Sequence, residues 1–109
     1  MQAIGSMFYV YLLASKPHGT LYVGVTSDLV ARMWQHKTKA FGGFTARHGV
    51  DRLVWYEAHQ SAETAIQREK QIKQWKRDWK INLIEHDNRY WIDLHAAIAE
   101  SPAGESAAV

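Results

Sequence analysis

Apolar residues near the N-terminus follow the pattern of two strands. Phe8–Ala14 (FYVYLLA) consists almost entirely of aromatic and branched residues. In residues 20–26 every second residue is a leucine or valine, and the residues between them are threonine, tyrosine and glycine. Pro17 and Gly19 lie in the short connection and favour a turn, so we expect an antiparallel hairpin.

The position of the turn sets which residues of this hairpin are paired. A turn centred on the Lys16–Pro17 peptide pairs Tyr11 with Tyr22. The same register places Tyr9 opposite Gly24. The rings of Tyr11 and Tyr22 would then lie side by side on one face, and a shift of one residue would separate them.

The apolar period changes to that of a helix after the hairpin. Thr26 or Ser27 is a suitable N-cap, Asp28 would lie in the first turn, and the helix would end near Lys37. The apolar positions of its inner face are Leu29 and Met33, flanked by Val30. Arg32 and His36 each follow an inner position by three residues, so they should lie together at the border of the buried stripe.

Residues 38–50 (TKAFGGFTARHGV) contain three glycines and predict a mobile loop. The alternating segment 51–59 (DRLVWYEAH) predicts a third strand. Ser61 should then cap a second helix, whose apolar stripe is formed by Ala62, Ala65, Ile66 and Ile72. A third helix, about Lys76 to His86, should follow after a bend.

These elements predict an α+β fold in which helices flank a three-stranded antiparallel sheet, in the order β-β-α-β-α-α. Residues 1–97 would form one domain, and residues 98–109, which are small and polar, would form a disordered tail.

Composition narrows the class of protein. The 109 residues include 47% apolar residues, enough for a core, and no cysteine, which excludes disulfides, thiolate zinc sites and cysteine nucleophiles. No apolar run approaches the ~18 residues of a membrane span, and the N-terminus does not resemble a signal peptide. We therefore expect a cytoplasmic protein with no membrane partner.

Charge is unevenly distributed although the net charge is only +2. Residues 68–80 carry six basic and two acidic side chains, a local +4, and residues 81–109 carry one basic and five acidic side chains, a local −4. The basic segment includes Trp75 and Trp79, which suits a nucleic-acid backbone, although a solvated helix face is the common alternative. The basic candidates for nucleic-acid contacts are Lys37, Lys39, Arg47, Arg68, Lys73, Lys76, Arg77 and Lys80.

Glu69 has the most unusual position in the sequence, because it falls in the middle of an apolar helical stripe. A carboxylate there must be paired, protonated or bound to a cation. Lys73, one turn later, offers an ordinary ion pair. The functional alternative is a ligand for Mg²⁺, which often uses one or two carboxylates and completes its shell with water and phosphate.

Four other side chains offer chemistry that would act together with such a carboxylate. Tyr11 and Tyr22 would suit the wet edge of a sheet, but a phenol beside a cation can also orient or deprotonate water. Arg32 could bind a phosphate, and His36 could move a proton. The histidines lack HxxxH and HExxH spacing, so a histidine-built zinc site is not expected.

Five segments of the chain also occur in an order that is typical of one superfamily. They are the triplets Tyr9-Val10-Tyr11 and Tyr22-Val23-Gly24, the segment TSDLVARMWQH with Arg32 and His36, the segment AIQREKQIKQWKRDWKINLIE with Glu69, and the closing NRYWIDL. Together they resemble the GIY-YIG nuclease superfamily over about residues 7–95, and within it the small stand-alone bacterial members. The chain departs from the family pattern at Tyr9, where glycine is usual, and at Arg89, where proline is usual. Asn82 and Asn88 are both candidates for the asparagine that lies near the metal in some relatives.

The resemblance implies a metal-dependent endonuclease that hydrolyses phosphodiester bonds in DNA, including branched or damaged DNA in repair or recombination. In that scheme Glu69 holds Mg²⁺ or Mn²⁺, Arg32 neutralises the phosphate, and Tyr22 or Tyr11 acts on the attacking water with help from His36. The modest charge and the lack of a further DNA-targeting domain suggest weak binding or a targeting protein partner. Two alternatives remain open, a nucleic-acid-binding module with little or no catalysis and a protein-interaction domain that kept only the fold.

Overall fold

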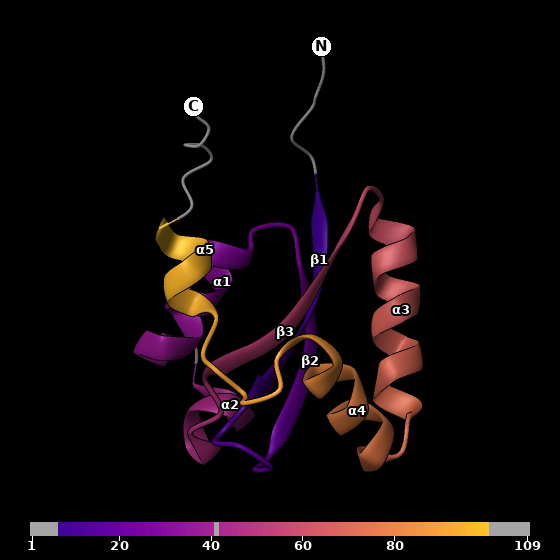
Figure 1. Ribbon diagram of the computed structural model, residues 1–109. Helices are drawn as coiled ribbons and strands as arrows, with labels where there is room; N and C mark the ends of the chain where they lie inside the picture. The colour runs from indigo at the N-terminus through magenta and orange to yellow at the C-terminus, as the bar shows by residue number, and fades with distance from the viewer. Residues whose placement is uncertain (1–6, 41, 101–109) are drawn as a thin grey trace.

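The computed structural model describes residues 7–40 and 42–100, which form a three-stranded antiparallel sheet between two layers of helices (Figure 1). The strands are β1 (Phe8–Ala14), β2 (Leu21–Thr26) and β3 (Arg52–His59). The helices are α1 (Leu29–Thr38), α2 (Gly43–His48), α3 (Ala62–Gln74), α4 (Arg77–Asp87) and α5 (His95–Glu100). The predicted fold class is confirmed, and α2 and α5 are additional to the predicted elements.

The strand order is β2-β1-β3, so β1 is the central strand and is paired on both sides. The pairing of β1 with β3 is irregular, because Leu12 faces Trp55 while Leu13 faces Leu53. Val54 is therefore left over in a β-bulge, and Val54 and Trp55 both face the same core. The strict alternation expected for this strand is wrong at that point.

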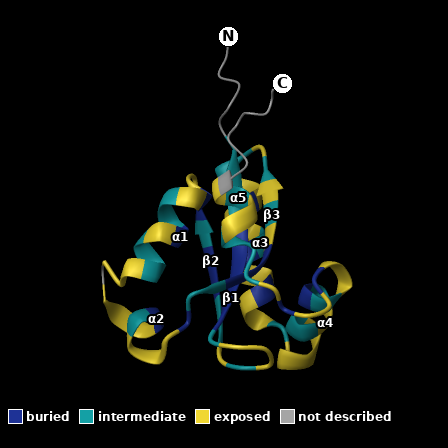
Figure 2. Ribbon diagram, turned by 60° about the vertical axis from the view of Figure 1, so that its left-hand side comes forward, coloured by how far each residue is buried: buried dark blue, intermediate teal, exposed yellow. Residues whose placement is uncertain are grey.

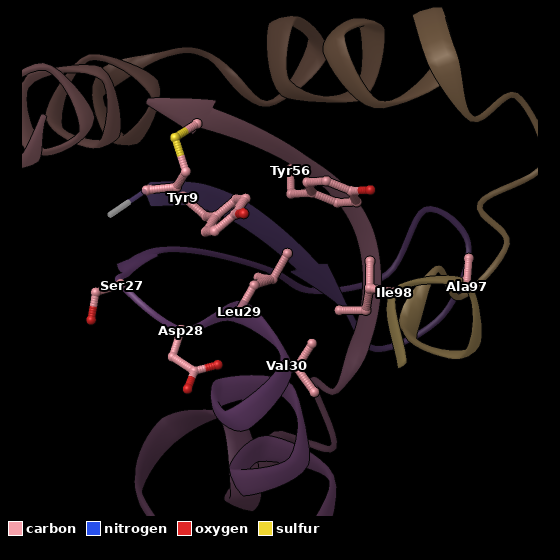
Figure 3. A pocket seen from close by; sticks show the side chains of 9 residues that line it. Tyr9, Ser27, Asp28, Leu29, Val30, Tyr56, Ala97 and Ile98 are labelled. Carbon is pink, nitrogen blue, oxygen red and sulfur yellow. The ribbon is translucent and has the colours of Figure 1, made fainter. Parts of the chain in front are cut away.

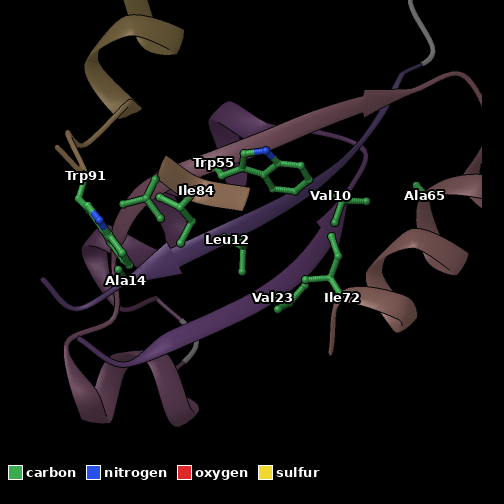
Figure 4. Close-up of a cluster of buried hydrophobic side chains, with 10 residues drawn as sticks. Val10, Leu12, Ala14, Val23, Trp55, Ala65, Ile72, Ile84 and Trp91 are labelled. Carbon is green, nitrogen blue, oxygen red and sulfur yellow. The ribbon is translucent and has the colours of Figure 1, made fainter. Parts of the chain in front are cut away.

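Each face of the sheet buries its own cluster of apolar side chains. The face covered by α3 and α4 holds Val10, Leu12, Ala14, Val23, Val54, Trp55, Ala65, Ile72, Ile84 and Trp91 (Figure 4). The face covered by α1 and α5 holds Tyr11, Leu13, Leu29, Met33, Val50 and Leu53. Figure 2 shows the buried strands at the centre and exposed residues on the outer surfaces of the helices. Even-numbered and odd-numbered residues of β1 thus belong to different cores.

The hairpin turn lies one residue later than expected. Ser15 N donates to Thr20 O over 3.0 Å, and Gly19 N donates to Lys16 O over 2.8 Å. Tyr11 consequently faces Gly24 instead of Tyr22, a register two residues away from the predicted one. An even shift preserves the parity of each position, so the prediction that Tyr11 and Tyr22 share a face is confirmed.

The first helix differs from its predicted start and surroundings. Asp28, and not Thr26 or Ser27, is the N-cap, because its Oδ1 accepts a hydrogen bond from Ala31 N over 3.1 Å. Val30 is exposed and does not flank the core. The segment 38–50 was predicted to be a loop, but Gly43–His48 within it form α2, with Gly42 and Gly49 as its caps.

The helix that carries Glu69 agrees closely with the prediction. Ser61 caps α3 by accepting a hydrogen bond from Thr64 N over 3.2 Å. Ala65, Glu69 and Ile72 are buried, whereas Ile66 is exposed and does not belong to the buried stripe. The chain bends after α3, and α4 begins at Arg77 as expected.

The closing segment 88–94 ties α4, β3 and α1 together through polar contacts. Asn88 is buried; its Nδ2 donates to Val54 O over 3.1 Å and to Ile92 O over 2.8 Å, and its Oδ1 accepts from Ile92 N over 3.0 Å. Asp93 accepts from Lys37 Nζ over 2.6 Å. Burial works to raise the pKa of Asp93, but the bond from Lys37 and backbone donors outweigh it, so the pKa is lowered.

The C-terminal helix continues past the predicted end of the domain at residue 97, because α5 runs through Glu100. The rest of the predicted disordered tail, residues 101–109, lies outside the described residues. Among the described helices none is long and apolar enough to cross a membrane.

Replacing Asn88 by alanine should destabilise the fold by about 2–3 kcal/mol, because it leaves three backbone groups without their hydrogen-bond partner. Denaturant unfolding measures the loss. Asn82→Ala is the matched control, since Asn82 is exposed on the preceding helix and should change stability by no more than about 0.5 kcal/mol. Equal effects of the two substitutions would show that Asn88 has no structural role.

Candidate active site

Three rings from different elements meet on the face of the sheet covered by α1. Tyr11 comes from the central strand, Tyr22 from the edge strand β2, and His36 from α1. The ring centroids lie 6.4 Å apart for the two tyrosines, 5.9 Å for Tyr11 and His36, and 5.8 Å for Tyr22 and His36. The structure therefore brings together three of the residues that the sequence singled out.

Gly24 makes this arrangement sterically possible. A Cβ atom at Gly24 would lie 2.4 Å from both Cζ and Oη of Tyr11. The phenol end of Tyr11 thus lies directly over the backbone of the edge strand, and no side chain can stand there. Gly24 does not have a positive φ, so its backbone conformation does not require glycine. The close approach of the Tyr11 ring is what requires glycine at this position of the second triplet.

His36 is held from both ring nitrogens. Its Nε2 lies 3.2 Å from Tyr11 Oη, and its Nδ1 lies 3.0 Å from Thr45 Oγ1 on α2. Thr45 is buried, so α2 fixes the orientation of the imidazole. Sequence analysis missed Thr45, because the glycine-rich segment around it shows no period that would reveal a helix.

Burial keeps both groups of this hydrogen bond uncharged at neutral pH. Burial, with smaller contributions from the charges of Tyr22 and Glu69, raises the pKa of Tyr11 to about 12 against the opposing effect of the Arg32 guanidinium. Burial and the positive charge of Arg32 lower the pKa of His36, opposed by Asp51. Tyr11 is consequently a hydrogen-bonding phenol, and His36 is a neutral imidazole that can accept a proton.

Arg32 lines a cavity that opens beside these rings. Its Nε donates to Gln35 Oε1 over 3.1 Å, which fixes the guanidinium. The cavity has a volume of about 290 Å³. Its lining residues are Tyr22, Arg32, Gln35, His36, Lys39, Gly42, Gly43, Phe44 and Thr45. A guanidinium at the wall of a cavity of this size can bind a phosphate group.

Glu69 lies in the opposite layer, on α3, which packs against β1 and β2. The residue is only 9% exposed, and its Oε2 lies 2.6 Å from Lys73 Nζ. The hydrogen bond to Glu69 raises the pKa of Lys73, to which Tyr22 also contributes. The ion pair expected from the spacing is present, and the charge of Glu69 contributes to the raised pKa of Tyr11.

The donor set around Glu69 suits a hard cation and not zinc. Within residues 7–40 and 42–100 no group of three or more His, Cys, Asp or Glu side chains is arranged to hold a metal ion. A single carboxylate fits Mg²⁺ or Mn²⁺, which take their remaining oxygen ligands from water and phosphate. The side chain of Asn88 is fully used in backbone hydrogen bonds, and Asn82 lines a separate hollow with Trp75 and Trp79.

The basic residues selected from the sequence divide into engaged and accessible side chains. Lys37 binds Asp93, Arg68 binds Glu57 and covers the Trp75 ring, Lys73 binds Glu69, and Arg77 Nη2 donates to His18 O and Gly19 O. Lys39 is exposed but its Nζ lies 3.8 Å from Asp51 Oδ2, Arg47 and Lys76 are exposed, and Lys80 is half-buried. Arg77 therefore holds the hairpin turn, and five of the eight expected nucleic-acid contacts already have partners within the chain.

A larger cavity of about 550 Å³ lies elsewhere on the same face, between α1 and α5 (Figure 3). Tyr9 and Tyr56 line it, with ring centroids 6.3 Å apart in an edge-to-face arrangement. Tyr9, which stands where the family pattern has glycine, thus lines this cavity and not the one beside Arg32.

Comparisons with known proteins agree with the motifs. Residues 7–82 match the family described as the GIY-YIG catalytic domain, a range that contains all five candidate catalytic residues. A UPF0213 protein of Clostridium perfringens is 35% identical over 78 residues, covering 72% of this chain and 83% of the relative. A UPF0213 protein of Staphylococcus haemolyticus is 32% identical over 77 residues, covering 71% and 93%. The names of these relatives state no activity.

A solved structure is also similar to this chain. It is the solution NMR structure of a UPF0213 protein from Bacillus halodurans, with 30% sequence identity and a TM-score of 0.48. The similarity covers 75% of this chain and 86% of that one.

Gly24→Ala should destabilise the protein by about 1–3 kcal/mol, because the added methyl group collides with the Tyr11 ring. Chemical denaturation measures this loss. The same substitution in a Tyr11→Ala background should cost at least about 1 kcal/mol less, since the colliding ring is gone. Strictly additive losses in this double-mutant cycle would contradict the close approach of the two residues.

Tyr11 should make stability fall at alkaline pH. The pKa of Tyr11 is about 12 in the folded protein and ~10 in the unfolded chain. The contribution of Tyr11 to the free energy of unfolding is therefore complete below pH ~10 and is lost as the pH rises toward 12. Unfolding free energies measured over this range should decline less steeply in Tyr11→Phe than in the parent. Parallel curves for the two proteins would refute the raised pKa.

Proposed function

The chain belongs to the GIY-YIG catalytic domain family, a nuclease family, and we propose that it is a metal-dependent endonuclease that hydrolyses phosphodiester bonds in DNA. The observation that carries the proposal is the meeting of Tyr11, Tyr22 and His36 beside Arg32, with the buried carboxylate of Glu69 on α3, the helix that packs against β1 and β2. A structural core would not need a fixed guanidinium, a buried carboxylate and two phenols.

Arg32 is the residue that we assign to the scissile phosphate. Its guanidinium lines the cavity and is fixed by Gln35, so it is already oriented for a phosphate before the substrate arrives. A pre-oriented cation stabilises the negative charge that develops on the phosphate oxygens as water attacks phosphorus.

The two tyrosines take different roles in this scheme. Tyr11 is fully buried with a pKa of about 12, so it stays protonated and orients its neighbours by hydrogen bonding. Tyr22 is less buried and lines the cavity, so we assign it to the attacking water. His36 is the neutral imidazole beside Tyr22, and it would receive the proton that the water loses at the nitrogen that gives up its contact with Tyr11 or Thr45.

Glu69 is the residue that would hold Mg²⁺ or Mn²⁺. When bound, such an ion supplies Lewis-acid polarisation of the phosphate and stabilises the leaving oxygen. The chain's contribution is to present one buried carboxylate from α3, the helix that packs against β1 and β2, the strands that carry the two phenols.

Charge on the surface supports weak, salt-sensitive contacts with the DNA backbone. Arg47 is exposed on α2, and Lys39 lines the cavity in a long, half-exposed ion pair of 3.8 Å with Asp51 that a flanking phosphate can replace. With so few accessible cations, selection of branched or damaged DNA would need a targeting protein partner or recognition of the DNA shape.

A second candidate function is nucleic-acid binding with little or no catalysis. One observation favours it: Glu69 is already neutralised by Lys73, so the side chain that would hold the metal has an internal partner. Metal-dependent cleavage distinguishes this alternative from the nuclease.

Glu69→Gln should lower the rate of DNA cleavage by at least about 100-fold, because it removes the carboxylate charge at the proposed metal ligand. The assay incubates the purified protein with supercoiled plasmid, a forked duplex and a plain duplex, each with Mg²⁺, with Mn²⁺ and with a chelator. Lys70→Gln is the control, since Lys70 is exposed on the same helix and lies outside the site.

The same experiment decides between the two candidate functions. Cleavage by the parent protein that the chelator abolishes and Glu69→Gln lacks supports the nuclease. DNA binding without cleavage under any of these conditions supports the binding module. Cleavage at the parental rate by Glu69→Gln would remove Glu69 from the mechanism.

A further inference from the structure

Lys73 occupies the carboxylate that the proposed nuclease needs for its metal. Its Nζ lies 2.6 Å from Glu69 Oε2, one helical turn away on α3. The two side chains differ in exposure, with 55% of the Lys73 side chain and 11% of the Glu69 side chain accessible. The lysine therefore covers the acid from the solvent side.

The pair explains how Glu69 is tolerated between Ala65 and Ile72 in a buried stripe. An ionised carboxylate removed from water requires a partner, and Lys73 is the cation that the structure places on it. The neighbouring bases do not substitute for it: Arg68 is bound to Glu57, and Lys70 is exposed. The charge of the isolated protein is thus balanced at Glu69 without any metal.

A divalent cation at Glu69 competes with the Lys73 ammonium for the same carboxylate. A metal would bind within ~2.1 Å of an oxygen that Lys73 already holds, and the two positive charges would repel one another. Lysine has a flexible four-carbon stem, so its ammonium can move without a change in the backbone. A partner for the displaced charge would be a phosphate oxygen, because the bound substrate carries negative charge at the same place.

We propose that Lys73 is an internal competitor for the divalent cation at Glu69, and that its ammonium moves to a phosphate of the nucleic acid when the cation binds. The inference rests on the proposed metal role of Glu69. It assigns Lys73 a positioning role, and it makes the binding of metal and of nucleic acid mutually dependent.

The consequence is a site that takes up metal poorly until the substrate is present. Without nucleic acid, the cation must break an ion pair and leave the ammonium without a partner. With nucleic acid, the phosphate accepts the ammonium, so the same step costs less. Linkage requires the reverse as well, so the metal strengthens the contact between Lys73 and the phosphate by the same factor.

The competition can be tested without an activity assay by measuring how tightly the full chain binds Mn²⁺. Titration calorimetry and the paramagnetic resonance signal of free Mn²⁺ both measure this affinity. Lys73→Met should bind Mn²⁺ at least about fivefold more tightly than the parent, because no ammonium has to be displaced. Lys73→Gln, which keeps a hydrogen-bonding group but no charge, should change the affinity in the same direction. Lys70→Met is the matched control and should leave it unchanged.

A second arm measures the coupling. A phosphorothioate DNA duplex, which is hydrolysed slowly, should raise the Mn²⁺ affinity of the parent by a larger factor than that of Lys73→Met. In thermal unfolding without metal, Lys73→Met should melt at a lower temperature than the parent, and Mn²⁺ should restore its melting temperature.

The outcomes separate this inference from the proposed function. If Glu69→Gln abolishes Mn²⁺ binding but Lys73→Met and Lys73→Gln bind no more tightly than the parent, Glu69 keeps its metal role and the competition is wrong. If Glu69→Gln binds Mn²⁺ as the parent does, or no variant binds it, the metal site itself is wrong and the role of Lys73 falls with it. Tighter binding by both Lys73 variants together with the loss in Glu69→Gln supports both.

Discussion

The close contact between the phenol of Tyr11 and the backbone of Gly24 is the constraint on which the site depends. It requires a residue without a Cβ atom on the edge strand, and it directs a buried phenol toward the outer edge of the sheet. His36 then has a fixed hydrogen-bond partner, and Thr45 on α2 completes the set. The helix that follows the hairpin, the short helix after it and the sheet are thereby locked to one another at the point where the chemistry is proposed.

Parity explains why the sequence predicted the shared face of the tyrosines correctly while it placed the turn wrongly. A strand's faces alternate with a period of two, so a two-residue error in register moves partners without moving faces. The apolar pattern carries information about faces, because burial acts on faces. It carries little about the turn, where His18 adopts a positive φ that no apolar pattern could indicate. The bulge at Val54 and the helix α2 escaped prediction because both arise from tertiary packing.

Charged side chains were the least predictable part of the candidate site. A run of basic residues on a helix indicates a local charge, but the partner of each cation depends on what the fold brings near it. Arg77 donates hydrogen bonds to carbonyl groups of the hairpin turn. Lys37 donates to Asp93 in the closing segment 88–94. These partners lie 59 and 56 positions away in sequence, beyond the reach of any local pattern. Only the i,i+4 pair of Glu69 and Lys73 was accessible to reasoning from spacing.

The two layers of helices contribute different ionisable groups on the two sides of β1 and β2. The layer with α1 supplies the guanidinium of Arg32 and the neutral imidazole of His36, and the layer with α3 supplies the carboxylate of Glu69. The edge strand β2 is the element between them, and it carries Tyr22 and Gly24. Since an edge strand has no further strand beside it, a long polymer can pass along this side of the sheet and reach both layers at once. The strand order β2-β1-β3 is therefore as much a condition of the proposed activity as the identity of the side chains, because with β2 in the interior the same residues would be closed off from DNA.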